Sequence, residues 1–225
     1  ISFEVSKGET LAIVGATGAG KSTIINLLNR FYGIQSGRIS IDGHNINALS
    51  LKGLRSHIAV VLQDVFLFAD TIENNISLGN SEVSLSEIEA AAKEIGVHDF
   101  IESLPGGYQF NVKERGGMLS SGQRQLIAFL RAYVTKPSIL VLDEATSSID
   151  SASEQLIQKA TDTITKGRTS IVIAHRLATI QKASNILVMD AGVIVEQGTH
   201  EALLKKGGYY KNLYEAQFLS VAVVE

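Results

Sequence analysis

The sequence predicts an α/β fold with a mostly parallel sheet, because short β-branched apolar runs alternate along the chain with stretches of helical periodicity. Nearly continuous apolar strands are typical of parallel sheets that are covered on both faces. A helix is expected after Gly20, where Ile24, Leu27, Leu28 and Phe31 repeat at one-face spacing. The expected strands are residues 11–14, 57–62, 139–142, 169–174 and 186–189.

The composition restricts the function. The chain has 225 residues and is 45% hydrophobic, which is enough to bury a substantial core. Its 20 basic and 23 acidic residues leave a net charge of −3, so we expect no nucleic-acid partner. It contains no cysteine, which excludes disulfides, thiolate catalysis and cysteine-based metal sites.

Residues 63–132 interrupt the strand pattern and predict an inserted helical subdomain. Within this segment Ser84 and Glu87 form a capping-box pattern ahead of an apolar run, and Gly96 is placed to end that helix. Residues 1–62 and 133–225 then form the α/β core. Glycine turns and alternating polarity around residues 37–41 and 192–196 predict strands of a small antiparallel sheet.

The first five residues alternate between apolar and polar, which predicts a further strand, and the chain begins with Ile1. Neither a signal peptide nor an apolar run of about 18 residues is visible. We therefore expect a soluble fragment that lacks upstream residues.

Phosphate binding is predicted by the segment from Gly15 to Ser22, which fills every fixed position of the phosphate-loop pattern. The segment lies between a predicted strand and a predicted helix, as the pattern requires. Its glycines let backbone N–H groups turn toward an anion. Lys21 can then reach the outer phosphates, and the Ser22 hydroxyl can ligate Mg²⁺.

Polar side chains at the ends of other strands predict the remaining chemistry. The apolar strand 139–142 runs directly into Asp143 and Glu144, at the sheet edge where ligands of α/β proteins bind. One carboxylate can support Mg²⁺ while the other accepts a proton from an attacking water. Gln63 and His175 also follow predicted strands. The Gln63 amide can ligate the metal or hold the water, while a solvated glutamine and a structural histidine remain the alternatives.

The segment LSSGQ at residues 119–123, followed by an amphipathic helix from Arg124, resembles the signature sequence of ABC ATPases. Ser121 departs from the family pattern, which has a glycine there, and we expect this change between small residues to be tolerated. The motifs of this family follow one another along the chain in the same order as in ABC ATPases, and the resemblance covers essentially the whole chain. They are the phosphate loop (Walker A), a glutamine loop at Gln63, the signature, Walker B at Asp143 and Glu144, a D-loop at residues 147–150 and a switch histidine at His175.

Two further segments resemble elements of ABC exporters rather than importers. Residues 113–116, KERG, resemble the exporter X-loop, and residues 63–76 resemble the segment that grips the coupling helices of the membrane domains. The family also places an aromatic upstream of the phosphate loop to stack on adenine. The only aromatic before Gly15 is Phe3, which lies in the predicted first strand. The resemblance therefore implies that this platform lies upstream of the chain, together with strands that complete the small antiparallel sheet.

The resemblance implies the nucleotide-binding domain of a multidrug- or lipid-exporter-like ABC transporter, an ATPase that uses ATP and Mg²⁺. It implies a head-to-tail homo- or heterodimer with a second nucleotide-binding domain, transmembrane domains contacted through residues 63–76, and a location at the cytoplasmic face of a membrane such as the bacterial inner membrane. Glu144, as general base, His175 and Gln63 are the implied catalytic residues, and Ser22, Gln63 and Asp143 the implied metal ligands. The implied nucleotide ligands are Gly15, Thr17, Gly18, Ala19, Gly20, Lys21, Ser22 and Thr23 for the domain's own ATP, and Ser120, Gly122 and Gln123 for the ATP of its partner.

Two alternatives share parts of this pattern. A soluble ABC ATPase that acts on ribosomes, DNA repair or chromosome structure has the same ATP chemistry, and the exporter-like segments together with the lack of a basic field disfavour it. A regulatory module that binds ATP without hydrolysing it is disfavoured by the presence of both Glu144 and His175.

Overall fold

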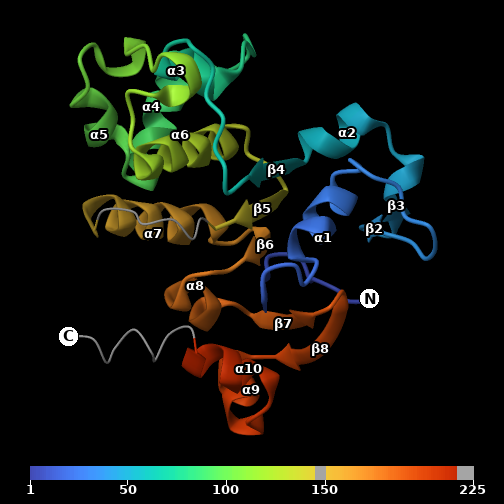
Figure 1. Cartoon of the computed structure of the whole chain (residues 1–225). Coiled ribbons are helices and arrows are strands. Elements are labelled where there is room, and N and C mark those ends of the chain that lie inside the picture. Colours follow the sequence, from blue (N-terminus) through green and yellow to red (C-terminus); the bar gives the residue numbers. More distant parts are fainter. Residues whose placement is uncertain (145–150, 217–225) are drawn as a thin grey trace. The chain divides into compact units, whose positions relative to one another are not determined.

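The computed structural model describes residues 1–144 and 151–216. The chain divides into two compact units (Figure 1). The first unit comprises residues 1–58, 141–144 and 167–225, and the second comprises residues 59–140 and 145–166.

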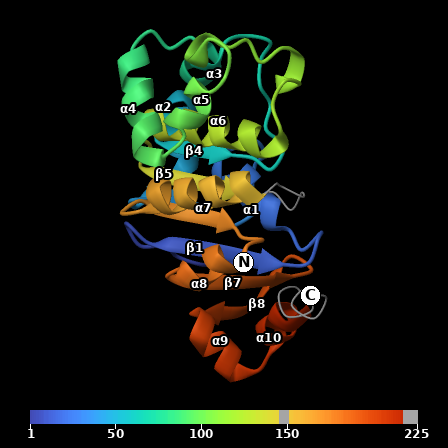
Figure 2. The same cartoon turned by 90° about the vertical axis from the view of Figure 1, so that its left-hand side faces the viewer.

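The first unit contains a mostly parallel sheet around β1 (Thr10–Gly15), as predicted. β6 (Thr169–Ile173) and β7 (Asn185–Asp190) flank β1, both parallel to it (Figure 2). All residues of β1 after Thr10 are buried, which explains the continuous apolar runs. The six-stranded sheet also contains β4 (Ile58–Val61), β5 (Ile139–Asp143) and β8 (Val193–Gly198), in the order β4-β5-β6-β1-β7-β8, and residues 59–61 and 139–140 of these strands belong to the second unit.

The position of β8 corrects one prediction. Residues 192–196 do not join a small antiparallel sheet, because β8 pairs antiparallel with β7 at the edge of the main sheet. The reason is the tight turn between these strands, in which Ala191 and Gly192 both have a positive φ, of 45° and 82°. The small antiparallel sheet consists of β2 (Ser40–Ile41) and β3 (His44–Asn45).

Two other predictions for the first unit are wrong. Residues 1–5 form no strand, because none of the described strands pairs with them. Phe31 is not part of the helix that follows Gly20, since α1 (Lys21–Leu28) ends earlier and Arg30 turns the chain with a φ of 52°. Phe31 is 53% exposed, and the Arg55 guanidinium lies 5.0 Å from the centre of its ring.

The first unit also contains shorter helices. The helices α9 and α10 pack against β8 (Figure 2). The shorter helices of this unit are η1 (Ile46–Ala48), α2 (Leu51–Ser56), α8 (Leu177–Lys182), α9 (His200–Lys206) and α10 (Tyr209–Tyr214).

The second unit is built around α6 (Ser121–Val134), which packs against α3, α4 and α7 (Figure 1). The predicted capping box of α4 is present, with Ser84 and Glu87 bonded reciprocally, and Gly96 ends the helix in a left-handed conformation. Residues 63–132 are therefore helical as predicted, while the bounds of the predicted subdomain stay a prediction. The remaining elements are α3 (Ile72–Ser77), α4 (Leu85–Ile95), α5 (His98–Glu102), η2 (Gly107–Gln109), η3 (Glu114–Gly116) and α7 (Ser151–Thr165).

Candidate active site

A glycine-rich loop connects β1 to α1. Gly15 has a φ of 151°, and a Cβ at this position would lie 2.2 Å from the carbonyl oxygen of Met189 on β7. Gly20 has a φ of 97° and directly precedes α1. Glycine is the residue that tolerates both the close approach and the positive φ. A loop of this kind before a helix is a common phosphate-binding arrangement.

Lys21, the first residue of α1, folds back over the loop. Its ammonium donates to the carbonyl oxygens of Gly15 and Ala16, at 2.8 and 3.0 Å. Lys21 is only 8% exposed, and this burial lowers its pKa, while the negative charge of Asp143 partly opposes the shift. The loop therefore contains a poorly solvated cation, which can exchange its carbonyl contacts for phosphate oxygens.

Ser22 and Asp143 bring two oxygen donors together beside this loop. The Ser22 hydroxyl donates to Asp143 Oδ2 at 3.4 Å, and Asp143, the last residue of β5, is buried. Hydroxyl and carboxylate oxygens are ligands that suit a hard cation such as Mg²⁺. The structure thus brings together two of the three predicted metal ligands.

Glu144 is buried directly after β5. Its carboxylate accepts hydrogen bonds from the N–H groups of His175 and Arg176, at 2.9 and 3.0 Å, and from the Thr179 hydroxyl at 2.5 Å. Burial raises the pKa of Glu144, and these hydrogen bonds oppose the shift because they stabilise the ionised form. A partly desolvated carboxylate at the end of a strand is a suitable proton acceptor.

His175 follows β6 and contacts Glu144 through its own backbone. Burial lowers the pKa of the imidazole, and the nearby positive charge of Lys21 lowers it further. The ring is therefore uncharged at neutral pH, so that one ring nitrogen donates and the other accepts. Glu144, His175, Lys21, Ser22 and Asp143 all belong to the first unit.

The signature residues lie in the second unit, at the start of α6. Ser120 Oγ accepts from the Gln123 N–H at 3.2 Å, and Gln123 Oε1 accepts from the Ser120 N–H at 2.9 Å. This second capping box explains why the helix begins at Ser121 and not at Arg124 as expected. Gly122 is buried, while Ser120 is exposed.

Residues 63–76 present two aromatic rings to solvent. Phe66 and Phe68 are each 55% exposed, and their rings meet edge to face with centroids 5.1 Å apart. Hydrogen bonds from two other side chains hold the backbone of these residues. The fully buried Asn75 side chain bonds the N–H and the carbonyl oxygen of Phe68, and Arg131 on α6 donates to the main-chain oxygens of Phe66 and Asn75. An exposed aromatic pair on a rigid backbone is typical of a contact surface.

The exporter-like segment 113–116 packs against residues 63–76. Lys113 and Arg115 have positive φ values of 60° and 52°, which are uncommon outside glycine. A Cβ on Gly116 would lie 2.9 Å from Arg124 Cδ and 3.0 Å from Leu67 Cδ1. This close approach explains the glycine that follows the two strained residues.

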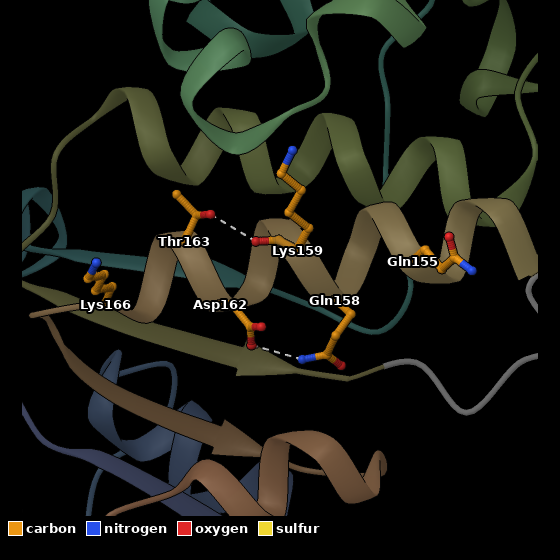
Figure 3. A pocket seen from close by; sticks show the side chains of 6 residues that line it. All are labelled: Gln155, Gln158, Lys159, Asp162, Thr163 and Lys166. Carbon is orange, nitrogen blue, oxygen red and sulfur yellow. Dashed lines mark hydrogen bonds between the residues drawn. The ribbon is translucent and has the colours of Figure 1, made fainter.

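A hollow of about 570 Å³ lies along α7 (Figure 3). It contains none of the predicted site residues, and two of its polar side chains bond along the helix: Gln158 to Asp162 and Thr163 to the Lys159 oxygen, both at 2.9 Å. We therefore assign it no part in the chemistry. Its lining residues are Gln155, Gln158, Lys159, Asp162, Thr163 and Lys166.

Comparison with known proteins identifies the family. The ABC transporter family model matches residues 1–147. The chain belongs to the ABC transporter family. The chain is 53% identical over 97% of its length to an ATP-dependent lipid A-core flippase of Saccharophagus degradans, and 51% identical over 96% to a probable multidrug resistance ABC transporter ATP-binding/permease protein of Bacillus subtilis. It covers 37% and 32% of these relatives.

A solved bacterial Atm1-family ABC exporter with ATP bound has a similar fold to this ABC transporter chain. The TM-score is 0.89 with 46% identity, and the match covers 97% of this chain and 38% of that one. The predicted fold class and the resemblance to ABC exporters are therefore confirmed, and the ATP-dependent and ATP-bound relatives agree with the expected class of enzyme, an ATPase. Among the residues that the structure describes, no helix is long and apolar enough to span a membrane.

The ABC transporter motifs are distributed over both units. Gln63, which follows β4, lies in the second unit together with Ser120, Gly122 and Gln123. The predicted D-loop at residues 147–150 lies outside the described residues. The roles of the individual site residues stay predictions.

Three residues of this ABC transporter chain were not predicted from sequence. Thr179, Asn75 and Arg131 make the contacts described above with Glu144 and with the segment 63–76. The sequence could have indicated Arg131, because a charged residue is unusual on a helix of mostly buried apolar residues. Nothing in the sequence singles out Thr179, since an isolated threonine in a helix is ordinary.

Proposed function

We propose that this domain binds ATP with Mg²⁺ through its phosphate loop and hydrolyses it with Glu144 as general base. The observation that carries the proposal is the buried carboxylate of Glu144 next to the Ser22–Asp143 pair, in the unit that holds the Lys21 loop. Loop N–H groups and Lys21 bind the phosphates, and Thr23 follows Ser22 on the same helix start.

The residues present fit a magnesium ion. Ser22 and Asp143 place hydroxyl and carboxylate oxygens 3.4 Å apart, and Mg²⁺ takes few protein ligands because it retains several waters. We propose Gln63 as a further ligand, on the resemblance alone. When bound, the ion supplies positive charge that neutralises the phosphate oxygens during transfer.

Hydrolysis then needs one base and one hydrogen-bond donor from this chain. As the oxygen of water bonds to the γ-phosphorus, the bond to the bridging oxygen of ADP breaks, and the proton of the water passes to Glu144. The uncharged imidazole of His175 can donate to the γ-phosphate. The products are ADP and inorganic phosphate.

We further propose that two such domains form a head-to-tail dimer. In this dimer Ser120, Gly122 and Gln123 contact the ATP bound to the partner's phosphate loop. The exposed start of α6, where Ser120 is accessible, supports this role, because a helix start carries partial positive charge suited to phosphate. Both active sites are then shared between the two chains.

The proposed output is transport across a membrane. Phe66 and Phe68, on the backbone held by Asn75 and Arg131, are the proposed contact with the transmembrane domains. We propose that the domain lies at the cytoplasmic face of a membrane. The ATP-binding/permease relatives, of which the chain covers about a third, support an export function.

The test is phosphate release by the whole transporter and by its Glu144→Gln variant. The amide keeps the shape of the side chain but cannot accept the proton, so we expect ATP binding to persist while turnover falls by at least about 100-fold. Turnover of the variant within about twofold of the parent would remove Glu144 from the role of base.

A further inference from the structure

The carboxylate of Glu144 is engaged on both oxygens. Oε2 accepts the N–H groups of His175 and Arg176, and Oε1 accepts the Thr179 hydroxyl. Glu144 is 3% exposed and Thr179 is 5% exposed, so these bonds lie away from bulk water. Two backbone donors occupy Oε2, so a proton from water is accepted at Oε1, where the Thr179 hydroxyl competes with the water for the oxygen.

The Thr179 hydroxyl is used differently from the threonine hydroxyls of α7. On α7, Thr161 and Thr163 donate to the carbonyl oxygens of the residues four positions earlier, which is the usual bond for a threonine inside a helix. Thr179 on α8 instead donates to a carboxylate 35 residues away, at 2.5 Å. This hydroxyl thus acts on the proposed base and not on its own helix.

We propose that Thr179 is a positioning residue that restrains Glu144, and that its bond to Oε1 breaks before this oxygen accepts a proton from the attacking water. The proposal rests on the proposed hydrolysis by Glu144. A general base needs a lone pair directed at the water within hydrogen-bond reach. The value of kcat is therefore proportional to the fraction of time for which Oε1 is free of the Thr179 hydroxyl. The Thr179 bond keeps this fraction low.

The same bonds connect release to His175. The N–H that binds Oε2 belongs to His175, the residue expected to contact the γ-phosphate. A displacement of the His175 backbone would therefore loosen the hold on Oε2, while the Thr179 bond restrains Oε1 separately.

The test compares basal ATP hydrolysis by the whole transporter and its variants. Thr179→Val keeps the shape and removes the hydroxyl, so we expect kcat to rise about tenfold, the order of magnitude by which a hydrogen bond to a charged group shifts an equilibrium. The KM for ATP should stay within about twofold of the parent, because no phosphate contact changes. Thr179→Ser, which restores the hydroxyl, should bring kcat back toward the parent value.

Thr161→Val is the matched control, because Thr161 is equally buried but donates only within α7, and we expect no change in kcat. If Thr179→Val does not fold, Thr179→Ala provides the same comparison. A kcat that is unchanged or lowered in the folded variant, while Glu144→Gln is inactive, overturns the role of Thr179 alone. Sustained turnover by Glu144→Gln overturns the proposed hydrolysis instead.

Discussion

Arg131 donates from Nε to the main-chain oxygen of Asn75 at 2.8 Å. Its other guanidinium nitrogens donate to the oxygen of Phe66, at 3.3 Å each. One side chain of α6, the helix that begins at the signature, therefore holds the backbone on which Phe66 and Phe68 are displayed. This guanidinium therefore links α6 directly to the backbone of the proposed transmembrane contact.

Arg131→Met should therefore destabilise the second unit. The substitution keeps much of the apolar stem but leaves the oxygens of Asn75 and Phe66 without this charged donor, so we expect the free energy of unfolding to fall by about 2 kcal/mol. Urea unfolding followed by circular dichroism measures the loss. The control is Arg38→Met, at an exposed arginine. Equal midpoints for the two variants would contradict the anchoring role.

Gly15→Ala, at the first residue of the phosphate loop, should distort the loop. The new Cβ would lie 2.2 Å from the Met189 oxygen, so either β7 or the loop must shift, and we expect a destabilisation of about 2 kcal/mol together with weaker ATP binding. Gly33→Ala is the matched control, because a Cβ there meets nothing within 4 Å. Calorimetric titration with ATP measures the binding, and equal affinities for the two variants would show that the loop tolerates the contact.

We expect Glu196 to make the free energy of unfolding depend on pH. Its buried carboxylate accepts the Tyr210 N–H at 2.7 Å and pairs with Lys206 at 3.1 Å, and chiefly the Tyr210 bond holds its pKa below the ordinary 4.5. Because the folded-state pKa is lowered, the stabilisation is present above about pH 4.5 and is lost as the pH falls through the folded-state pKa.

Glu196→Gln should consequently lower the free energy of unfolding by about 1.5 kcal/mol at pH 7, and the difference from the parent should shrink below about pH 4.5. Denaturant unfolding at a series of pH values measures this difference. Glu4→Gln, at an exposed position, serves as the control. A difference for Glu196→Gln that is constant from pH 7 to pH 3 would rule out the ionised carboxylate as its cause.

Local patterns explain which parts of this molecule the sequence predicts. The phosphate loop, the capping box of Ser84 and Glu87 and the strand before Asp143 are each encoded within a few neighbouring residues, and the structure has all three. The alternation in residues 1–5 is equally local, but a strand also requires a partner to pair with, which periodicity does not specify.

The contacts that tune the site are not local. Thr179 meets Glu144 across 35 positions of the chain, and Arg131 meets Asn75 across 56. Such pairs depend on which strand and helix ends the fold brings together, and neither residue type indicates its partner. The same holds for β8, whose alternating pattern suits a strand of either sheet; the tight turn at Gly192 decides that it pairs with β7.

The shared active site predicts that two inactive chains restore one another. Lys21→Ala removes the loop cation, and Ser120→Arg places a bulky side chain at the start of α6, so each homodimer should lack a complete site. In a head-to-tail dimer of one chain of each kind, both lesions fall in one site, and the other site keeps an intact Lys21 and an intact Ser120. With Glu144→Gln in every chain to prevent hydrolysis, we expect the mixed dimer to trap about half as much ATP as the dimer that carries only Glu144→Gln, and each parent variant to trap little.

The trapped nucleotide is measured on mixed dimers alone. The two chains carry different tags, so that mixed dimers are isolated first, and bound nucleotide is then counted after rapid gel filtration. If the signature and the phosphate loop served the same ATP within one chain, mixing would restore nothing. Trapping by isolated mixed dimers no greater than by either variant alone is thus the outcome that excludes a shared site.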